Sequence, residues 1–160
     1  MTFPQGAEEI ISAADTWYQG ARLFPRIGLS KVEEKHPILA KWTSVEDAIL
    51  RWNDAVTTAY VLCAMRSSAE LLEAKESGIA RLALMDLYKN DFPDGFLLVD
   101  ATLATEEWMA VLSRPMTYGT WIFCAVAMTD IADEQEDETV ELASTLGAMI
   151  VNFANEWWSK

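Results

Sequence analysis

The sequence predicts an all-α fold, namely a single-domain bundle of five or six helices over residues 1–160 with at most one short extended segment. Apolar residues recur at spacings of three and four along most of the chain, which is the period of one helix face. The hydrophobic share of 51% and the charged share of 23% are ordinary for a globular protein. Since no repeat or linker divides the 160 residues, we expect one core.

The bundle is expected to form around a long central helix over residues 44–76. Thr43 and Ser44 are good N-cap residues, and Thr43 with Glu46 matches a capping box. Gly78 is the expected stop. The apolar face of this helix is formed by Val45, Ile49, Trp52, Val56, Ala59 and Cys63.

Before the central helix, the pattern predicts a helix over residues 8–23 that ends at Pro25 and Gly28, followed by a connector over residues 24–42. Residues 22–41 are locally basic, with five cations against two acids. This basic loop either covers and partly neutralises the acidic body or has a function of its own, as long loops often do.

After the central helix, we expect helices over residues 79–90, 105–112, 115–131 and 138–158. Residues 96–99 are too few for periodicity to decide between an extended segment and a helix entry. In the last helix Gly147 belongs to a seam of small residues, and we expect it to contact the helix that contains residues 119–127.

The predicted core can be tested by truncating its side chains. If Ile49 is buried, its replacement by alanine should cost about 2–5 kcal/mol. The residues assigned to the core are Ile49, Trp52, Val56, Cys63, Ile122, Val126, Leu146 and Ile150.

The formal net charge of −13 and the pI near 4.3 argue against nucleic acid or an anionic membrane as a partner, because the field of the protein repels phosphates. A protein partner, in particular a basic one, is compatible with this charge, and so is self-association. Cys63 and Cys124 lie in apolar helical patterns, and we find no signal-peptide pattern and no apolar run that could span a bilayer. We therefore expect a cytoplasmic protein.

Recognisable catalytic motifs are absent from the sequence. His36 is the only histidine, and neither a nucleophile elbow nor a glycine-rich phosphate loop occurs. We expect no metal and no cofactor, and we lean against an enzyme. A weaker alternative is a site for magnesium formed by acids on facing helices, which would use Asp130, Asp133, Glu134, Glu70 and Glu73.

Residues 130–141 contain seven acids in twelve positions, and we call this segment the acidic ridge. It should be exposed, because buried carboxylates without partners are costly. Its role is either to bind a basic partner or to dock residues 22–41 of the same chain.

Tryptophan is common at interfaces, and Trp157 and Trp158 cannot both face one seam. The predicted partner-binding residues are Asp130, Asp133, Glu134, Glu136, Asp137, Glu138, Trp157 and Trp158.

The sequence thus favours a small acidic helical protein that binds another protein, as an inhibitor, an immunity-type or a chaperone-type module. One alternative is a helical-bundle enzyme or ligand-binding protein that uses carboxylates. Another is a structural subunit of an assembly.

Overall fold

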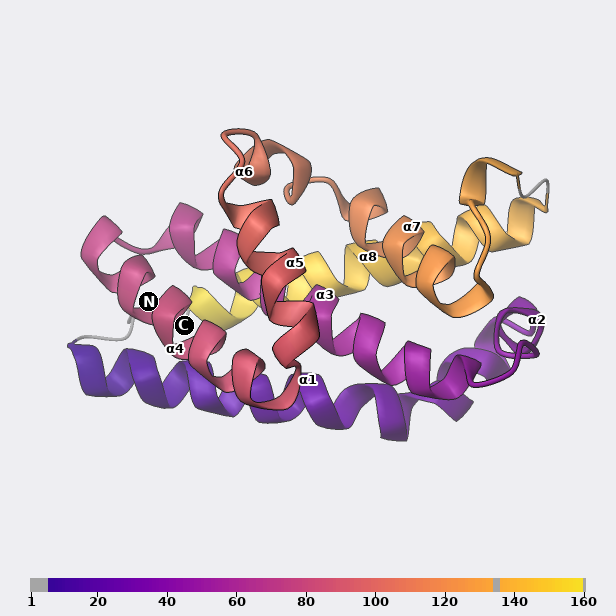
Figure 1. Ribbon diagram of the computed structural model, residues 1–160, viewed down its shortest axis with the longest axis horizontal. Coiled ribbons are helices and arrows are strands. Elements are labelled where there is room, and N and C mark those ends of the chain that lie inside the picture. The colour runs from indigo at the N-terminus through magenta and orange to yellow at the C-terminus, as the bar shows by residue number, and fades with distance from the viewer. Residues whose placement is uncertain (1–5, 134–135, 160) are drawn as a thin grey trace.

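The computed structural model describes residues 6–133 and 136–159, and they form an all-α bundle (Figure 1). Within these ranges six helices have eleven residues or more, two are short, and no strand occurs, which confirms the predicted fold class. Residues 96–99 are helical. The helices are α1 (Ala7–Lys35), α2 (Ile38–Trp42), α3 (Ala48–Leu71), α4 (Ala74–Asp91), α5 (Pro93–Leu103), α6 (Trp108–Val111), α7 (Pro115–Ala127) and α8 (Asp137–Trp158).

Helix α1 continues through Pro25 and Gly28, so the predicted stop there was wrong. Proline in a helix leaves the carbonyl four residues earlier without its usual donor. Here that carbonyl belongs to Ala21, and the buried hydroxyl of Thr57 in α3 donates to it over 3.1 Å. The basic segment of residues 22–41 is therefore mostly helix, formed by the last part of α1 and by α2, and is not the predicted long loop.

This contact predicts a coupling between Thr57 and Pro25. Replacing Thr57 by valine should cost about 1–3 kcal/mol, because it leaves a buried carbonyl of Ala21 without a donor. In a Pro25→Ala background the same change should cost clearly less, since the new backbone N–H at position 25 can bond to that carbonyl. Urea unfolding of the two single variants and the double variant measures this coupling, and strict additivity would refute it.

The central helix is shorter than predicted. Helix α3 begins at Ala48. The hydroxyls of Thr43 and Ser44 donate to backbone carbonyls of α2, so they do not cap α3. At the other end, Leu72 and Glu73 are extended and α4 begins at Ala74. The expected stop at Gly78 is also wrong, because Gly78 lies inside α4.

Helix α3 nonetheless is the centre of the bundle, since it packs against α1, α4, α7 and α8. Seven of the eight predicted core residues are buried. The exception is Ile49, which is 54% exposed. It lies in the first turn of α3, where Ala48 and Trp52 face the core and Ile49 faces outward, so Ile49→Ala should cost well under about 1 kcal/mol.

Tryptophan side chains connect the helices through their indole N–H groups as well as through their rings. Trp17 and Trp52 connect α1 with α3, donating to the carbonyls of Tyr60 over 3.0 Å and Pro25 over 2.8 Å. Trp42 of α2 donates to Thr139 of α8 over 3.3 Å. A buried indole N–H needs an acceptor, and these tryptophans find one on a neighbouring helix. Packing between helices therefore largely explains why the chain has so many tryptophans.

Helices α7 and α8 approach each other through two glycines. A Cβ atom at Gly147 would lie 1.8 Å from the carbonyl oxygen of Pro115, and one at Gly119 would lie 1.8 Å from that of Ala143. This confirms the predicted close contact at Gly147, since neither position has space for a side chain.

A membrane span needs a long and strongly apolar helix, and none of the helices in the described part of the chain meets both conditions.

Candidate functional site

The acidic ridge is exposed where the structure describes it. It follows α7, runs through a short 3-10 helix (Ile131–Asp133) and continues into the first turns of α8. The exposed acids of the ridge are Asp130, Asp133, Asp137, Glu138 and Glu141. Glu134 lies outside the described residues. Asp137 and Glu138 are in the first turn of α8, where the helix dipole favours negative charge.

One acid of the ridge has an internal partner. Lys41, in α2, forms an ion pair with Glu136 at the start of α8. The rival role, docking of the basic segment on the ridge, therefore has one contact in its favour. Both side chains of the pair remain substantially exposed, so we expect Glu136→Gln to lower the free energy of unfolding by less than about 1 kcal/mol.

Trp157 and Trp158 lie far from the ridge. They end α8, whereas the ridge leads into its beginning, and a 22-residue helix is about 33 Å long. Trp158 is fully buried and donates to the carbonyl of Ala64 over 3.0 Å, so it offers no surface to a partner. Trp157 is half-buried and donates to the carbonyl of Ala13 over 3.2 Å. The ridge and the two tryptophans therefore cannot form one contact patch.

The acids of the magnesium alternative that the structure describes are also not brought together. Glu70 lies near the end of α3 and pairs with Arg66 over 2.6 Å. The start of α3 is the end that meets α7, since Arg51 donates to the carbonyls of Ala125 and Val126. Glu70 is thus about 28 Å along the helix axis from that contact. Among residues 6–133 and 136–159, no three His, Cys, Asp or Glu side chains are grouped so that they could hold a metal ion.

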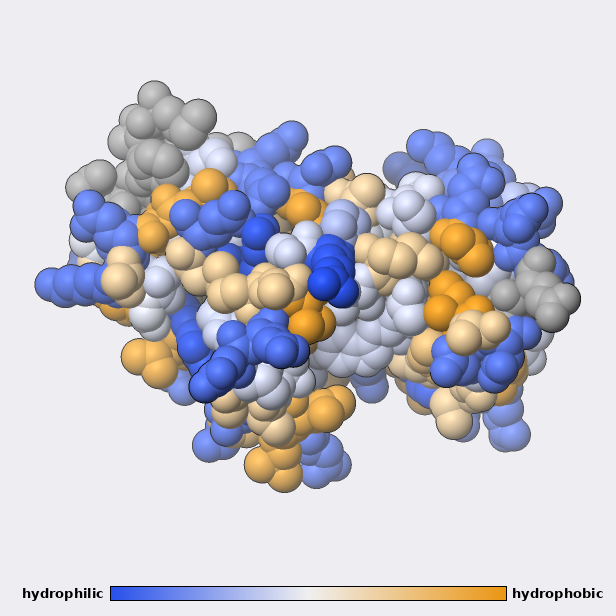
Figure 2. Space-filling model, turned by 90° about the horizontal axis from the view of Figure 1, so that it is seen from above, coloured by the Kyte–Doolittle hydropathy of each residue, from blue (hydrophilic) through white to orange (hydrophobic). Residues whose placement is uncertain are grey.

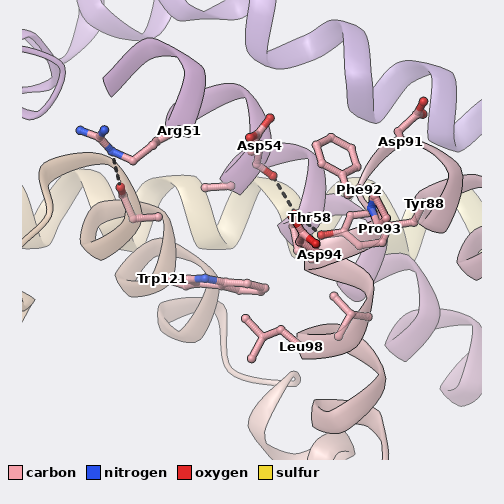
Figure 3. Close-up of a pocket in the computed structure, with 14 residues that line it drawn as sticks. Arg51, Asp54, Thr58, Tyr88, Asp91, Phe92, Pro93, Asp94, Leu98 and Trp121 are labelled. Carbon is pink, nitrogen blue, oxygen red and sulfur yellow. Dashed lines mark hydrogen bonds between the residues drawn. The ribbon is translucent and has the colours of Figure 1, made fainter. Parts of the chain in front are cut away.

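A cavity of about 400 Å³ opens between α3, α5 and α7, beside the end of α7 from which the ridge continues (Figure 3). Trp121 of α7 reaches toward Leu98 of α5, and these two side chains give the cavity an apolar wall. Deeper inside, the hydroxyls of Thr58 and Tyr88 lie 2.8 Å apart. This recess can accept an apolar or amphipathic side chain.

Carboxylates surround the same cavity, but one of them is already engaged. Asp91 points toward α1, where it accepts from Tyr18 and pairs with Arg22 over 2.7 Å (Figure 3). Partial burial raises the pKa of Asp54, while the Arg22 guanidinium acts in the opposite direction. Asp54 and Asp94, both exposed at the rim, add negative charge beside the apolar wall.

Figure 2 shows hydrophobic residues in several small separate groups, with hydrophilic residues around them. Exposed hydrophobic residues that occur singly are normal for a soluble protein surface.

Sequence reasoning did not identify the cavity of Figure 3. Its residues come from α3, α4, α5 and α7, and none of them belongs to a recognisable motif. The signals available were Trp121 inside the helix that begins at Pro115, and the proline and glycine within residues 91–95, and neither indicates a pocket by itself.

Comparisons with protein-family models, with curated proteins and with solved structures give no match for this chain.

Proposed function

We propose that the protein is a binding module for a basic protein, which it contacts through the acidic ridge. The observation that carries this proposal is the exposure of Asp130, Asp133, Asp137, Glu138 and Glu141 in a chain of net charge −13. A concentration of charge of one sign accelerates the encounter with a partner of opposite charge and selects against partners of the same sign.

The cavity of Figure 3 supports the proposal by its position. It opens beside the end of α7, and the ridge begins a few residues later at Asp130. Protein interfaces commonly combine a polar rim with a pocket that receives one anchoring side chain. With Trp121 as its wall and Asp54 and Asp94 at its rim, the recess suits the long side chain of an arginine or lysine, because aromatic faces and carboxylates both attract such cations.

The test compares two variants of equal charge. The ridge variant carries Asp133→Asn, Asp137→Asn, Glu138→Gln and Glu141→Gln. The control variant carries the changes Asp86→Asn, Asp100→Asn, Glu106→Gln and Glu107→Gln, at exposed acids outside the ridge. Both variants raise the net charge by four, so that a difference between them reports the location of the charge and not its amount.

We expect proteins captured from a lysate of the source cell by the wild type and the control variant to be lost by the ridge variant. Mass spectrometry identifies them, and purified candidates are then tested for direct binding. Equal capture by both variants would contradict a ridge-specific role. If the ridge variant captures the same proteins as the wild type, the ridge is reduced to a solubility feature.

A further inference from the structure

A hollow of about 400 Å³ lies between α1 and the last turns of α8, whereas the acidic ridge leads into the beginning of α8. We call it the aromatic hollow, because five of its nine lining residues carry aromatic rings. Aromatic residues make up only 11% of the chain, so their concentration here is specific to this place. The rings belong to Trp17 and Phe24 of α1, Tyr60 of α3, and Phe153 and Trp157 of α8.

The hollow exists because a glycine separates two aromatic residues on α1. Trp17, Gly20 and Phe24 share one face of this helix, at steps of three and four residues. Nothing lies within 4 Å of the position that a Cβ would take at Gly20, so the space between the two rings is open. On α8, Phe153 and Trp157 are one helical turn apart and line the hollow from its other side.

Four of the rings form a continuous series. The centroid of the Trp17 ring is 5.8 Å from that of Trp157 and 5.7 Å from that of Tyr60, and the Tyr60 centroid is 5.4 Å from that of Phe24. Neighbouring planes are tilted by 49°, 52° and 56°, so the rings do not form a flat stack. Trp17 and Tyr60 are buried, whereas Phe24 and Trp157 are half-buried and Phe153 is 46% exposed. A ligand therefore has direct access to the last three.

Hydrogen bonds within the protein hold this lining in place. The indole N–H of Trp17 donates to the carbonyl of Tyr60 over 3.0 Å, and that of Trp157 donates to a carbonyl of α1 over 3.2 Å. The hydroxyl of Thr16 donates to a carbonyl one turn earlier in α1. Since these donors are already engaged, the lining offers a ligand mainly the surfaces of its rings.

A single carboxylate completes the hollow. Glu156 is the one charged residue among the described lining residues, it is exposed, and it forms no ion pair within the described part of the chain. The π-electrons of an aromatic ring attract cations, and aromatic sites of this kind recognise quaternary ammonium groups. Methyl groups also replace the N–H donors of such a cation, so it gives up few hydrogen bonds to water when it enters an aromatic site.

We propose that the aromatic hollow binds a quaternary ammonium group, which lies against Phe24, Phe153 and Trp157 with Glu156 as its counter-charge. Two sources present this group, namely a free choline-type molecule and the side chain of a trimethylated lysine in a protein. The hollow contains no residue of the acidic ridge, so this proposal and the proposed function can fail separately.

Two variants test the site, each with a matched control. Gly20→Leu fills the open space of the hollow, and Gly78→Leu is its control, because Gly78 also has open space but lies in α4 and does not line the hollow. Glu156→Gln removes the carboxylate at nearly constant size. Its control is Glu141→Gln, an exposed acid of the same helix outside the hollow. Circular dichroism and thermal melts verify that all four variants are folded.

The ligands are choline and its neutral isostere 3,3-dimethylbutan-1-ol, and binding is followed by NMR through the indole N–H signals. We expect choline to shift the signals of Trp17 and Trp157 with one-to-one saturation, while that of Trp42 in α2 stays unchanged. The wild type and both controls should bind choline at least tenfold more tightly than the isostere. Gly20→Leu should weaken choline binding at least tenfold, and Glu156→Gln at least threefold.

A peptide with a central trimethyllysine, compared with the same peptide carrying unmodified lysine, identifies the source of the cation. Tighter binding of the trimethylated peptide than of choline assigns the hollow to a protein side chain, and the reverse order assigns it to a free molecule. Equal affinity of the wild type for choline and its isostere would overturn the proposal, because binding would then depend on apolar surface alone. Shifts without saturation, or choline binding that Gly20→Leu leaves unchanged, would overturn it as well.

Discussion

Replacing Gly147 by alanine is expected to destabilise the protein by more than about 3 kcal/mol, although alanine is the better helix former. The added Cβ would lie 1.8 Å from the carbonyl oxygen of Pro115, which is backbone and cannot rotate away. Helices α7 and α8 would have to separate, and their contact is the most extensive between any two helices of the bundle. Gly147→Leu should prevent folding altogether.

Gly78→Ala is the internal control for this prediction. Gly78 is also inside a helix, but nothing lies within 4 Å of the position of its missing Cβ. The exchange should therefore stabilise the protein by roughly 0.5–1 kcal/mol, the ordinary gain of alanine over glycine in a helix. Denaturant unfolding measures both variants. If Gly147→Ala were neutral or stabilising, α7 and α8 would not cross as closely as described.

The second large effect is expected at Trp158. Truncation to alanine removes a fully buried indole and its hydrogen bond to the carbonyl of Ala64, and should cost about 3–5 kcal/mol. Trp157→Ala should cost clearly less, because its side chain is only half-buried. The two variants have the same composition, so the comparison isolates position.

The free energies of unfolding of the two variants, determined from urea titrations, provide the test. A larger loss for Trp157→Ala than for Trp158→Ala would mean that α8 is rotated by about one residue from the orientation described.

The sequence was sufficient to predict the structure where the local pattern of residues and the packing of the helices agree. The seam of α8 and its glycine were predicted from spacing, because small residues on an apolar helix face allow a second helix to approach closely. The proline start of α7 was likewise confirmed. For Trp157 and Trp158 the sequence predicts only that the two side chains point in different directions, because adjacent residues on a helix diverge by about 100°. It does not predict which of the two is buried.

The failures have identifiable physical causes. Pro25 was interpreted as a helix stop because the donor that makes it tolerable, Thr57, is 36 residues away from Ala21 in sequence. The break at Leu72 and Glu73 contains neither glycine nor proline, and Gly78 shows that a helix with tertiary support accommodates glycine. The cavity of Figure 3 combines residues from several helices, and spacing along one helix cannot reveal it.

The association rate constant for a captured partner, measured by stopped flow over a series of salt concentrations, tests the central proposal most directly. If the acidic ridge steers a basic partner, the rate constant of the wild type and of the equal-charge control variant should fall steeply with salt. The association rate constant of the ridge variant should be low even at low salt and should depend only weakly on the salt concentration. Equal rate constants and equal salt dependence for the ridge and control variants would contradict the proposal.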